Sequence, residues 1–142
     1  MLAPFLGPYP MGQYEQAALK AVQLFNAGRA VDPVDAWDQA TVSIFGRGTW
    51  SQEKSCPRDA FLGLCTDGHV KGVRPGNYTE SVANKSYAVA AAQLLKSNPG
   101  LTTMGTTGLW KRVLKQLNAT TSKAHNGQMN VVLALFRNKL LI

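Results

Sequence analysis

The chain has 142 residues, of which 45% are hydrophobic and 16% are charged. This length is typical of a single domain, and the apolar fraction is that of a globular protein and argues against an intrinsically disordered chain. No apolar run approaches the ~20 residues that a membrane-spanning helix needs. Fifteen basic and eight acidic residues give a formal net charge of +7, which favours an anionic partner such as nucleic acid or an acidic protein.

The first ten residues, MLAPFLGPYP, contain three prolines and no basic residue. A secretory signal needs a basic start and an unbroken apolar stretch, so this segment does not fit one. We expect residues 1–10 to form an N-terminal arm and residues 11–142 to form a single helical domain. Without an export signal, we expect a cytoplasmic protein.

Apolar residues at helical spacing predict three helices in the first half, over residues 13–27, 33–45 and 57–67. Gly28 stands where a left-handed glycine commonly ends a helix. Asp32 is suited to cap the second helix, with Pro33 in its first turn. Residues 46–55 are predicted to form a loop, and residues 69–79 allow at most a short β-hairpin.

The second half repeats this organisation, with predicted helices over residues 85–96, 108–118 and 127–138. An offset of 71 places Ser51–Cys65 on Ser122–Phe136 without a gap, and Trp37 and Trp110 fall in corresponding second helices. We therefore predict an all-α fold of six main helices in two similar three-helix halves, residues 11–76 and 77–142. Both tryptophans are expected to be buried in matching positions.

The two cysteines, Cys56 and Cys65, are nine residues apart on one predicted helix. Their Cα atoms would then lie about 13 Å apart, too far for a disulfide, so we expect two separate reduced thiols. Neither the cysteines nor the two histidines have the spacing of a zinc site. The sequence predicts no metal and no cofactor.

Charge is divided unevenly between the halves. Residues 1–72 hold six bases and seven acids, a net charge of −1, whereas residues 73–142 hold nine bases and only Glu80 as an acid, a net charge of +8. Lys111, Arg112 and Lys115 lie within five residues of one predicted helix, where they can contact phosphates. The leading interpretation is a non-enzymatic protein whose basic C-terminal half binds an anionic partner, with nucleic acid the first choice.

A second polar group surrounds the starts of the two third helices. A helix N-terminus presents unpaired N–H groups that can hold an anion. Six side chains near these starts are therefore candidate binding residues: Lys54, Arg58, Lys123, His125, Asn126 and Gln128. The simpler interpretation is helix capping, with Asn126 as the cap of the last helix.

Two alternatives remain open. Cys56 at a helix start could act as a nucleophile, with His125 as its base and Arg58 nearby, in a small enzyme whose site lies between the halves. The protein could also be a protein–protein interaction module.

The stretches SQEKSCPRDAFLGLCTDGHVKGV and SKAHNGQMNVVLALF resemble a family of small bacterial proteins known only as a domain of unknown function. The resemblance covers most of the chain after Met11. It implies a bacterial or phage origin and a single compact domain, and it brings no activity, cofactor or catalytic residue.

Overall fold

The computed structural model describes residues 12–119 and 124–142. The elements in chain order are α1 (Gln13–Asn26), α2 (Pro33–Phe45), α3 (Trp50–Glu53), α4 (Ser55–Thr66), α5 (Val82–Ser97), the 3₁₀ helix η1 (Pro99–Met104), α6 (Gly105–Gln116) and α7 (Gln128–Arg137). These residues contain no strand, and one isolated antiparallel bridge joins Val70 to Leu141. The predicted all-α fold with six main helices is confirmed. The expected arm over residues 1–10 lies outside the described residues.

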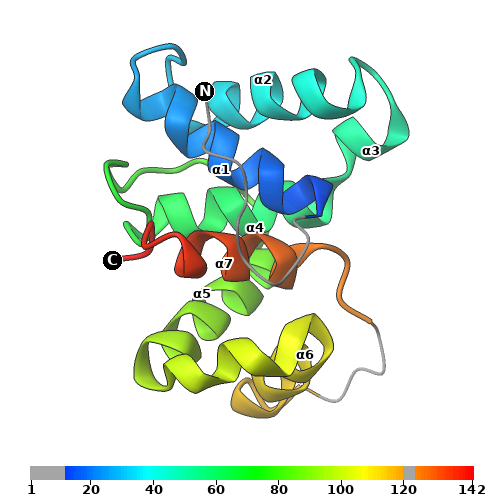
Figure 1. The fold of residues 1–142 in the computed structure, drawn as a ribbon, viewed down its shortest axis with the longest axis vertical. Coiled ribbons are helices and arrows are strands. Elements are labelled where there is room, and N and C mark those ends of the chain that lie inside the picture. The colour runs from blue at the N-terminus through cyan, green and yellow to red at the C-terminus, as the bar shows by residue number, and fades with distance from the viewer. Residues whose placement is uncertain (1–11, 120–123) are drawn as a thin grey trace.

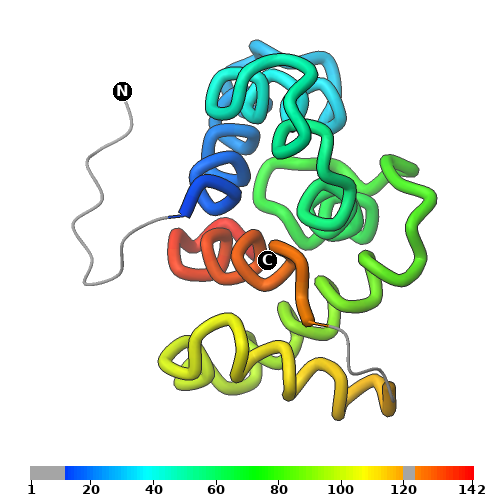
Figure 2. The backbone as a smooth tube through the Cα atoms, turned by 90° about the vertical axis from the view of Figure 1, so that its right-hand side faces the viewer, coloured from blue at the N-terminus to red at the C-terminus, as the bar shows by residue number. Residues whose placement is uncertain are grey.

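The helices are stacked along the long axis of the molecule (Figure 1). α1 and α2 pack together at one end, α6 lies at the other, and α4 and α7 run through the middle. The view from the side shows the same order, with α7 enclosed between α1 and the α5–α6 region (Figure 2). α7 contacts α1, α4, α5 and α6, so a segment from the end of the chain occupies the centre of the fold.

α7 is central because it is apolar on nearly every side. Seven of its ten residues are buried: Gln128, Met129, Val131, Val132, Leu133, Ala134 and Leu135. A helix with no polar face gains stability only when other elements surround it. The core is therefore built around α7, and α4 supplies the largest neighbouring cluster, with Phe61, Leu62, Leu64 and Cys65 each at most 1% exposed.

α4 and α5 cross at very close range, and Gly63 makes this crossing possible. A Cβ atom added at Gly63 would lie 2.7 Å from the Cα of Lys85 on α5. Such a distance is far below van der Waals contact, so any side chain at this position would force the two helices apart. α5 also carries three consecutive buried alanines, Ala90 to Ala92, whose small side chains let its several neighbours approach closely.

Both predicted tryptophan anchors are buried. Trp37 on α2 is 1% exposed and stacks on Phe61, with ring centroids 5.2 Å apart. Trp110 on α6 is 6% exposed and meets Tyr87 edge to face at 4.8 Å. Each ring fixes its helix to a neighbour, since an aromatic side chain buries a large apolar area.

The internal duplication remains a prediction. Some helix pairs correspond between the proposed halves, because α1 packs on α7 and α5 packs on α4. The first and third helices differ, however: α5 packs extensively on α7, whereas α1 and α4 make at most a marginal contact.

Several predicted helix starts were wrong. α4 begins at Ser55, α5 at Val82 and α6 at Gly105, each two or three residues earlier than the pattern indicated. The loop over residues 46–55 contains the short helix α3, capped by the Thr49 hydroxyl, which accepts a hydrogen bond from the Gln52 backbone N–H at 3.3 Å. Apolar periodicity misses such turns because their polar first residues carry no pattern.

Four helices end in the same way, at a residue of positive φ. Its own N–H and that of the following residue both donate to carbonyl groups of the last turn. The residues at this position are Gly28, Gly68, Asn118 and Lys139. The prediction for Gly28 is confirmed: its N–H donates to Phe25 and that of Arg29 donates to Leu24. Lys139 has a φ of 60°, which is strained for a side chain that is not glycine.

We expect Lys139→Gly to raise the free energy of unfolding by about 0.5–1 kcal/mol, because glycine relieves left-handed strain but costs some chain entropy. Gly28→Ala is the matched opposite, since φ is +73° and no atom lies within 4 Å of the added Cβ. Only backbone strain would act there, so stability should fall by about 1 kcal/mol. Urea denaturation measures both changes, and a destabilised Lys139→Gly variant would contradict this account.

Candidate functional site

The structure separates the predicted site residues into three places. Around the starts of α4 and α7 lie Lys54, His125, Asn126 and Gln128. Arg58 lies one turn into α4 and borders two pockets instead. The three bases of α6 belong to the end of the long axis opposite α2. Lys123 falls outside the described residues. The α6 bases were predicted as a separate group, and the polar group predicted around the two helix starts is itself divided, so each part has to be judged by its own contacts.

Lys54 and His125 are close neighbours. The ammonium group of Lys54 lies over two rings, 5.7 Å from the centroid of Tyr14 and 5.5 Å from that of Trp50. Burial lowers the pKa of His125, and the positive charge of Lys54 lowers it further. The Nδ1 atom of His125 is buried without a hydrogen-bond partner. This arrangement favours a neutral imidazole at physiological pH.

Gln128 and Asn126 have structural roles. Gln128 is 3% exposed, and its side-chain nitrogen donates to the Asn84 side-chain oxygen on α5 at 3.0 Å. Its side-chain oxygen accepts from the backbone N–H of Asn126. The prediction that Asn126 caps the last helix was wrong, because the N-cap is Gly127 and no side chain caps there. These two hydrogen bonds satisfy the buried side-chain amide of Gln128, and the bond to Asn84 joins α7 to α5.

Arg58 is held by its neighbour on α4. Its guanidinium donates to the Asp59 carboxylate at 2.8 Å, and the Thr79 hydroxyl donates to the same carboxylate oxygen at 2.9 Å. Asp59 is 9% exposed, so the pair anchors the segment that leads into α5. Arg58 borders a shallow pocket of about 470 Å³ on that side and a larger one on the α2 side.

The residues of the enzymatic alternative do not form a connected group. Cys56 and Arg58 are two positions apart on α4 and differ by about 200° around the helix axis. No hydrogen bond joins Cys56, Arg58 or His125 to either of the others within the described chain. A nucleophile and its base need such contact, or a short path through water.

The three bases of α6 form an outward face. Lys111, Arg112 and Lys115 are all exposed, and no described residue pairs with them. Other bases of this half are engaged: Lys85 pairs with Asp67 at 3.0 Å, and Arg137 donates to the Thr102 carbonyl at 2.9 Å. The three α6 side chains are therefore free to contact a partner.

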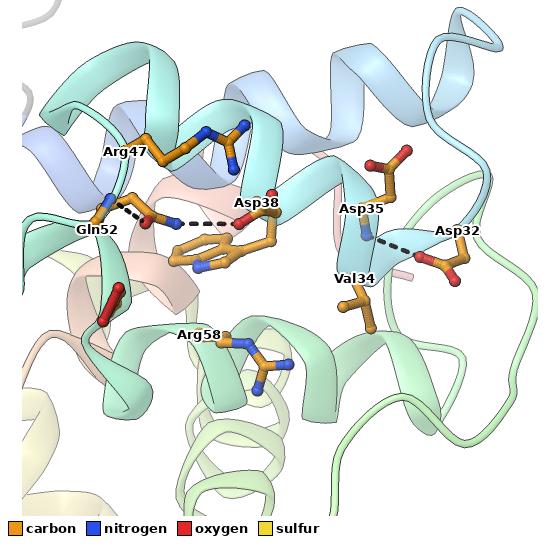
Figure 3. A pocket seen from close by; sticks show the side chains of 10 residues that line it. Asp32, Val34, Asp35, Asp38, Arg47, Gln52 and Arg58 are labelled. Atoms are coloured by element: carbon orange, nitrogen blue, oxygen red, sulfur yellow. Dashed lines mark hydrogen bonds between the residues drawn. The ribbon is translucent and has the colours of Figure 1, made fainter.

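Sequence reasoning missed a pocket of about 580 Å³ between α2, α3 and the start of α4 (Figure 3). Four acids and two arginines are among its lining residues: Asp32, Asp35, Asp38, Glu53, Arg47 and Arg58. The spacing of the three aspartates, every third residue from the N-cap of α2 onward, is the signal that could have indicated it.

Trp50 was also missed. Its side chain is 79% exposed at the start of α3, and the Lys54 ammonium lies over its ring. A tryptophan is usually buried, so exposure of this kind marks a surface of interest. The only sign of this exposure in the sequence is that the neighbours of Trp50 are mostly polar.

Among the described residues, no three side chains of histidine, cysteine, aspartate or glutamate come together in a way that could hold a metal ion. Within residues 12–119 and 124–142, no helix has the length and apolar character needed to cross a membrane.

The fold and these surfaces define a small all-α protein with a basic face at one end and an acid-rich pocket at the other. The chain belongs to a family of unknown function (DUF6979), whose model matches residues 11–142. This match confirms the resemblance seen in the sequence. Comparison with curated proteins and with solved structures finds no match.

The lowered pKa of His125 predicts a pH-dependent stability. From the ordinary value of 6.5 downward, the unfolded chain binds a proton at this residue more readily than the folded chain does. The contribution of His125 to the free energy of unfolding should therefore fall as the pH drops below about 6.5.

Urea denaturation at about pH 7.5 and about pH 5.5 measures this effect. The variant His125→Gln should lose less stability between these two pH values than the natural chain. His69→Gln makes the same change at the other histidine and serves as the control. Equal pH dependence in the natural chain and in His125→Gln would show that His125 does not contribute.

The two thiols should differ in reactivity. Cys65 is fully buried, and burial raises the pKa of its thiol, whereas Cys56 is half-buried and also free. A thiol reagent added to the folded protein should modify Cys56 alone, and unfolding should reveal the second thiol. Cys56→Ser should abolish the reaction of the folded protein. A count of no free thiols in unfolded protein without reductant would contradict the prediction.

Proposed function

We propose that this protein binds nucleic acid through the outward face of α6, contacting the phosphate backbone. One observation carries the proposal: Lys111, Arg112 and Lys115 are exposed together on the side of α6 that points away from its buried residues. Around the helix they span about 100°, opposite the face that carries Leu109 and Val113. A row of cations on one face of a helix suits a polyanion.

The distribution of charge supports the same face. Residues 32–53 hold four acids and one base, a net charge of −3, whereas residues 99–119 hold three bases and no acid, a net charge of +3. The first segment includes α2 and α3, and the second includes η1 and α6, at opposite ends of the long axis (Figure 1). The resulting dipole would turn the α6 end toward an approaching polyanion.

We expect this binding to depend little on the base sequence of the nucleic acid. Phosphate contacts position a protein on nucleic acid, whereas base contacts supply sequence specificity. Lysine and arginine dominate the outward face of α6, and the segment over residues 117–127 is longer than the 3–4 residue turn of a helix-turn-helix. We therefore infer backbone binding with dissociation constants of about 10⁻⁴–10⁻⁶ M at physiological salt.

The other two interpretations receive less support. An acidic protein could use the same cations, but nothing in the structure favours it over a polyanion with regularly spaced phosphates. The small-enzyme alternative needs Cys56, Arg58 and His125 to act together, and no contact among the described residues supports that.

The test is a salt titration of binding to labelled duplex and single-stranded oligonucleotides, followed by fluorescence anisotropy from about 50 to about 200 mM salt. Replacing Lys111, Arg112 and Lys115 together by glutamine should weaken binding. The slope of log K against log salt should become less steep by about 2.7 for duplex DNA, the value for three phosphate contacts. Glutamine forms helix nearly as well as lysine, so α6 should persist.

The matched control replaces Arg29, Lys71 and Arg74 by glutamine. These three bases are also exposed and have no described side-chain partner. Replacing them removes the same total charge from other surfaces of the molecule. Equal loss in both triple variants would show that net charge alone drives binding. Absence of binding by the natural chain at about 50 mM salt, where electrostatic contacts are strongest, would overturn the proposal.

A further inference from the structure

Trp50 differs from the other two tryptophans of the chain in its exposure to solvent. Trp37 and Trp110 are buried, whereas the side chain of Trp50 is 79% exposed. Contact between a large aromatic ring and water is unfavourable, and a ligand that covers the ring removes this contact. The exposed ring of Trp50 is therefore a candidate binding surface.

The backbone that carries Trp50 is tied to two other helices by hydrogen bonds. The Tyr14 hydroxyl on α1 donates to the carbonyl oxygen of Ser51 at 2.9 Å. The side-chain nitrogen of Gln52 donates to the Asp38 carboxylate on α2 at 3.1 Å. The residues on both sides of these bonds hold α3 in place, so the ring is presented to solvent from an anchored position. Anchoring of this kind reduces the entropy lost when a ligand binds.

Lys54 contacts the Trp50 ring and leaves most of it open. The Lys54 ammonium lies over this ring, 5.5 Å from its centroid, and 5.7 Å from the centroid of Tyr14. The attraction between a cation and an aromatic ring stabilises this arrangement. Because the side chain of Trp50 is 79% exposed, the face of the ring opposite Lys54 is open to solvent. The surface thus offers a flat apolar face beside a positive charge.

The surroundings of Trp50 are polar and positively charged. Its neighbours Thr49 and Ser51 are polar, and residues 47–58 hold three bases and one acid, a net charge of +2. The aspartates of α2 line the pocket on the side of Gln52, which differs from Trp50 by about 200° around α3. The core of a protein–protein interface is apolar and depleted of charge. A single aromatic ring beside cations is instead typical of a surface that binds single-stranded nucleic acid.

Neighbouring side chains connect this surface to α6. Burial and then the nearby charge of Lys54 lower the pKa of His125, so these two side chains are neighbours. The centroid of the His125 ring lies 6.2 Å from that of Trp110 on α6. In Figures 1 and 2 the segment that leads into α7 lies between α4 and α6. Trp50 and the basic helix are therefore linked through the start of α7.

We propose that Trp50 stacks on one base of a single-stranded nucleic acid whose phosphates contact the outward face of α6. This inference rests on the proposed function and adds to it a preference for single strands. In a duplex the base faces are covered by their neighbours, and a side chain can reach them only by unstacking a base step. A single strand can turn a base outward onto an aromatic ring. Every base has such a face, so the stacking is independent of sequence.

The test compares three labelled probes of one length, about 16 nucleotides, which covers the site size of small folds that bind single strands. The probes are oligothymidylate, an abasic strand with the same phosphates but no bases, and a duplex. The natural chain should bind oligothymidylate at least about fivefold more tightly than the abasic strand, the lower value for one stacked base. Trp50→Ala should abolish this difference without changing the affinity for the abasic strand or the duplex. Trp50→Phe keeps an aromatic ring and should retain most of the difference.

Val31→Ala is the matched control, because it truncates another exposed apolar side chain, 88% exposed, and should change none of the three affinities. Equal binding of oligothymidylate and the abasic strand would overturn the stacking role and leave the proposed function of α6 intact. Unchanged affinity of Trp50→Ala for oligothymidylate would overturn it in favour of a protein contact at Trp50. Absence of binding to all three probes at about 50 mM salt would overturn the proposed function and this inference together.

Discussion

The burial of α7 is the constraint on which the rest of this fold depends. A helix that is apolar on nearly all sides cannot lie on a surface, so α1, α4, α5 and α6 must surround it. Its one buried polar side chain, Gln128, then needs a partner, and Asn84 on α5 supplies it. Close packing of α4 on α5 at Gly63 completes the enclosure. The hydrophobic effect thus dictates a central position for a helix that arrives late in the chain.

Because the core is apolar, the charged groups of the molecule lie on its surface. The charged groups separate toward the two ends of the long axis, with acids around α2 and α3 and bases on α6. Each end has a distinct character: a pocket lined by hydrogen-bonded carboxylates, and a helix with exposed cations. One small domain can therefore present two surfaces of opposite charge without mutual neutralisation, since the distance between them exceeds the reach of direct pairing.

Sequence reasoning succeeded where one helix carries its own information. Apolar periodicity located the six main helices, and Asp32 and Gly28 marked a start and an end as predicted. It failed where position depends on other elements. Asn126 looked like a cap, but Gln128 folds back onto its backbone instead. The pocket around Trp37 combines residues from α2, α3 and α4, and no local pattern contains all of them.

The helices also differ in how firmly the core holds them. α7 buries seven residues, whereas α6 buries three, Leu109, Trp110 and Val113, and packs chiefly on α5 and η1. Local opening of a protein costs least where few apolar contacts are lost. Amide hydrogens of α6 should therefore exchange with solvent well before those of α7. The basic face consequently lies on a helix that the core holds less firmly than it holds α7.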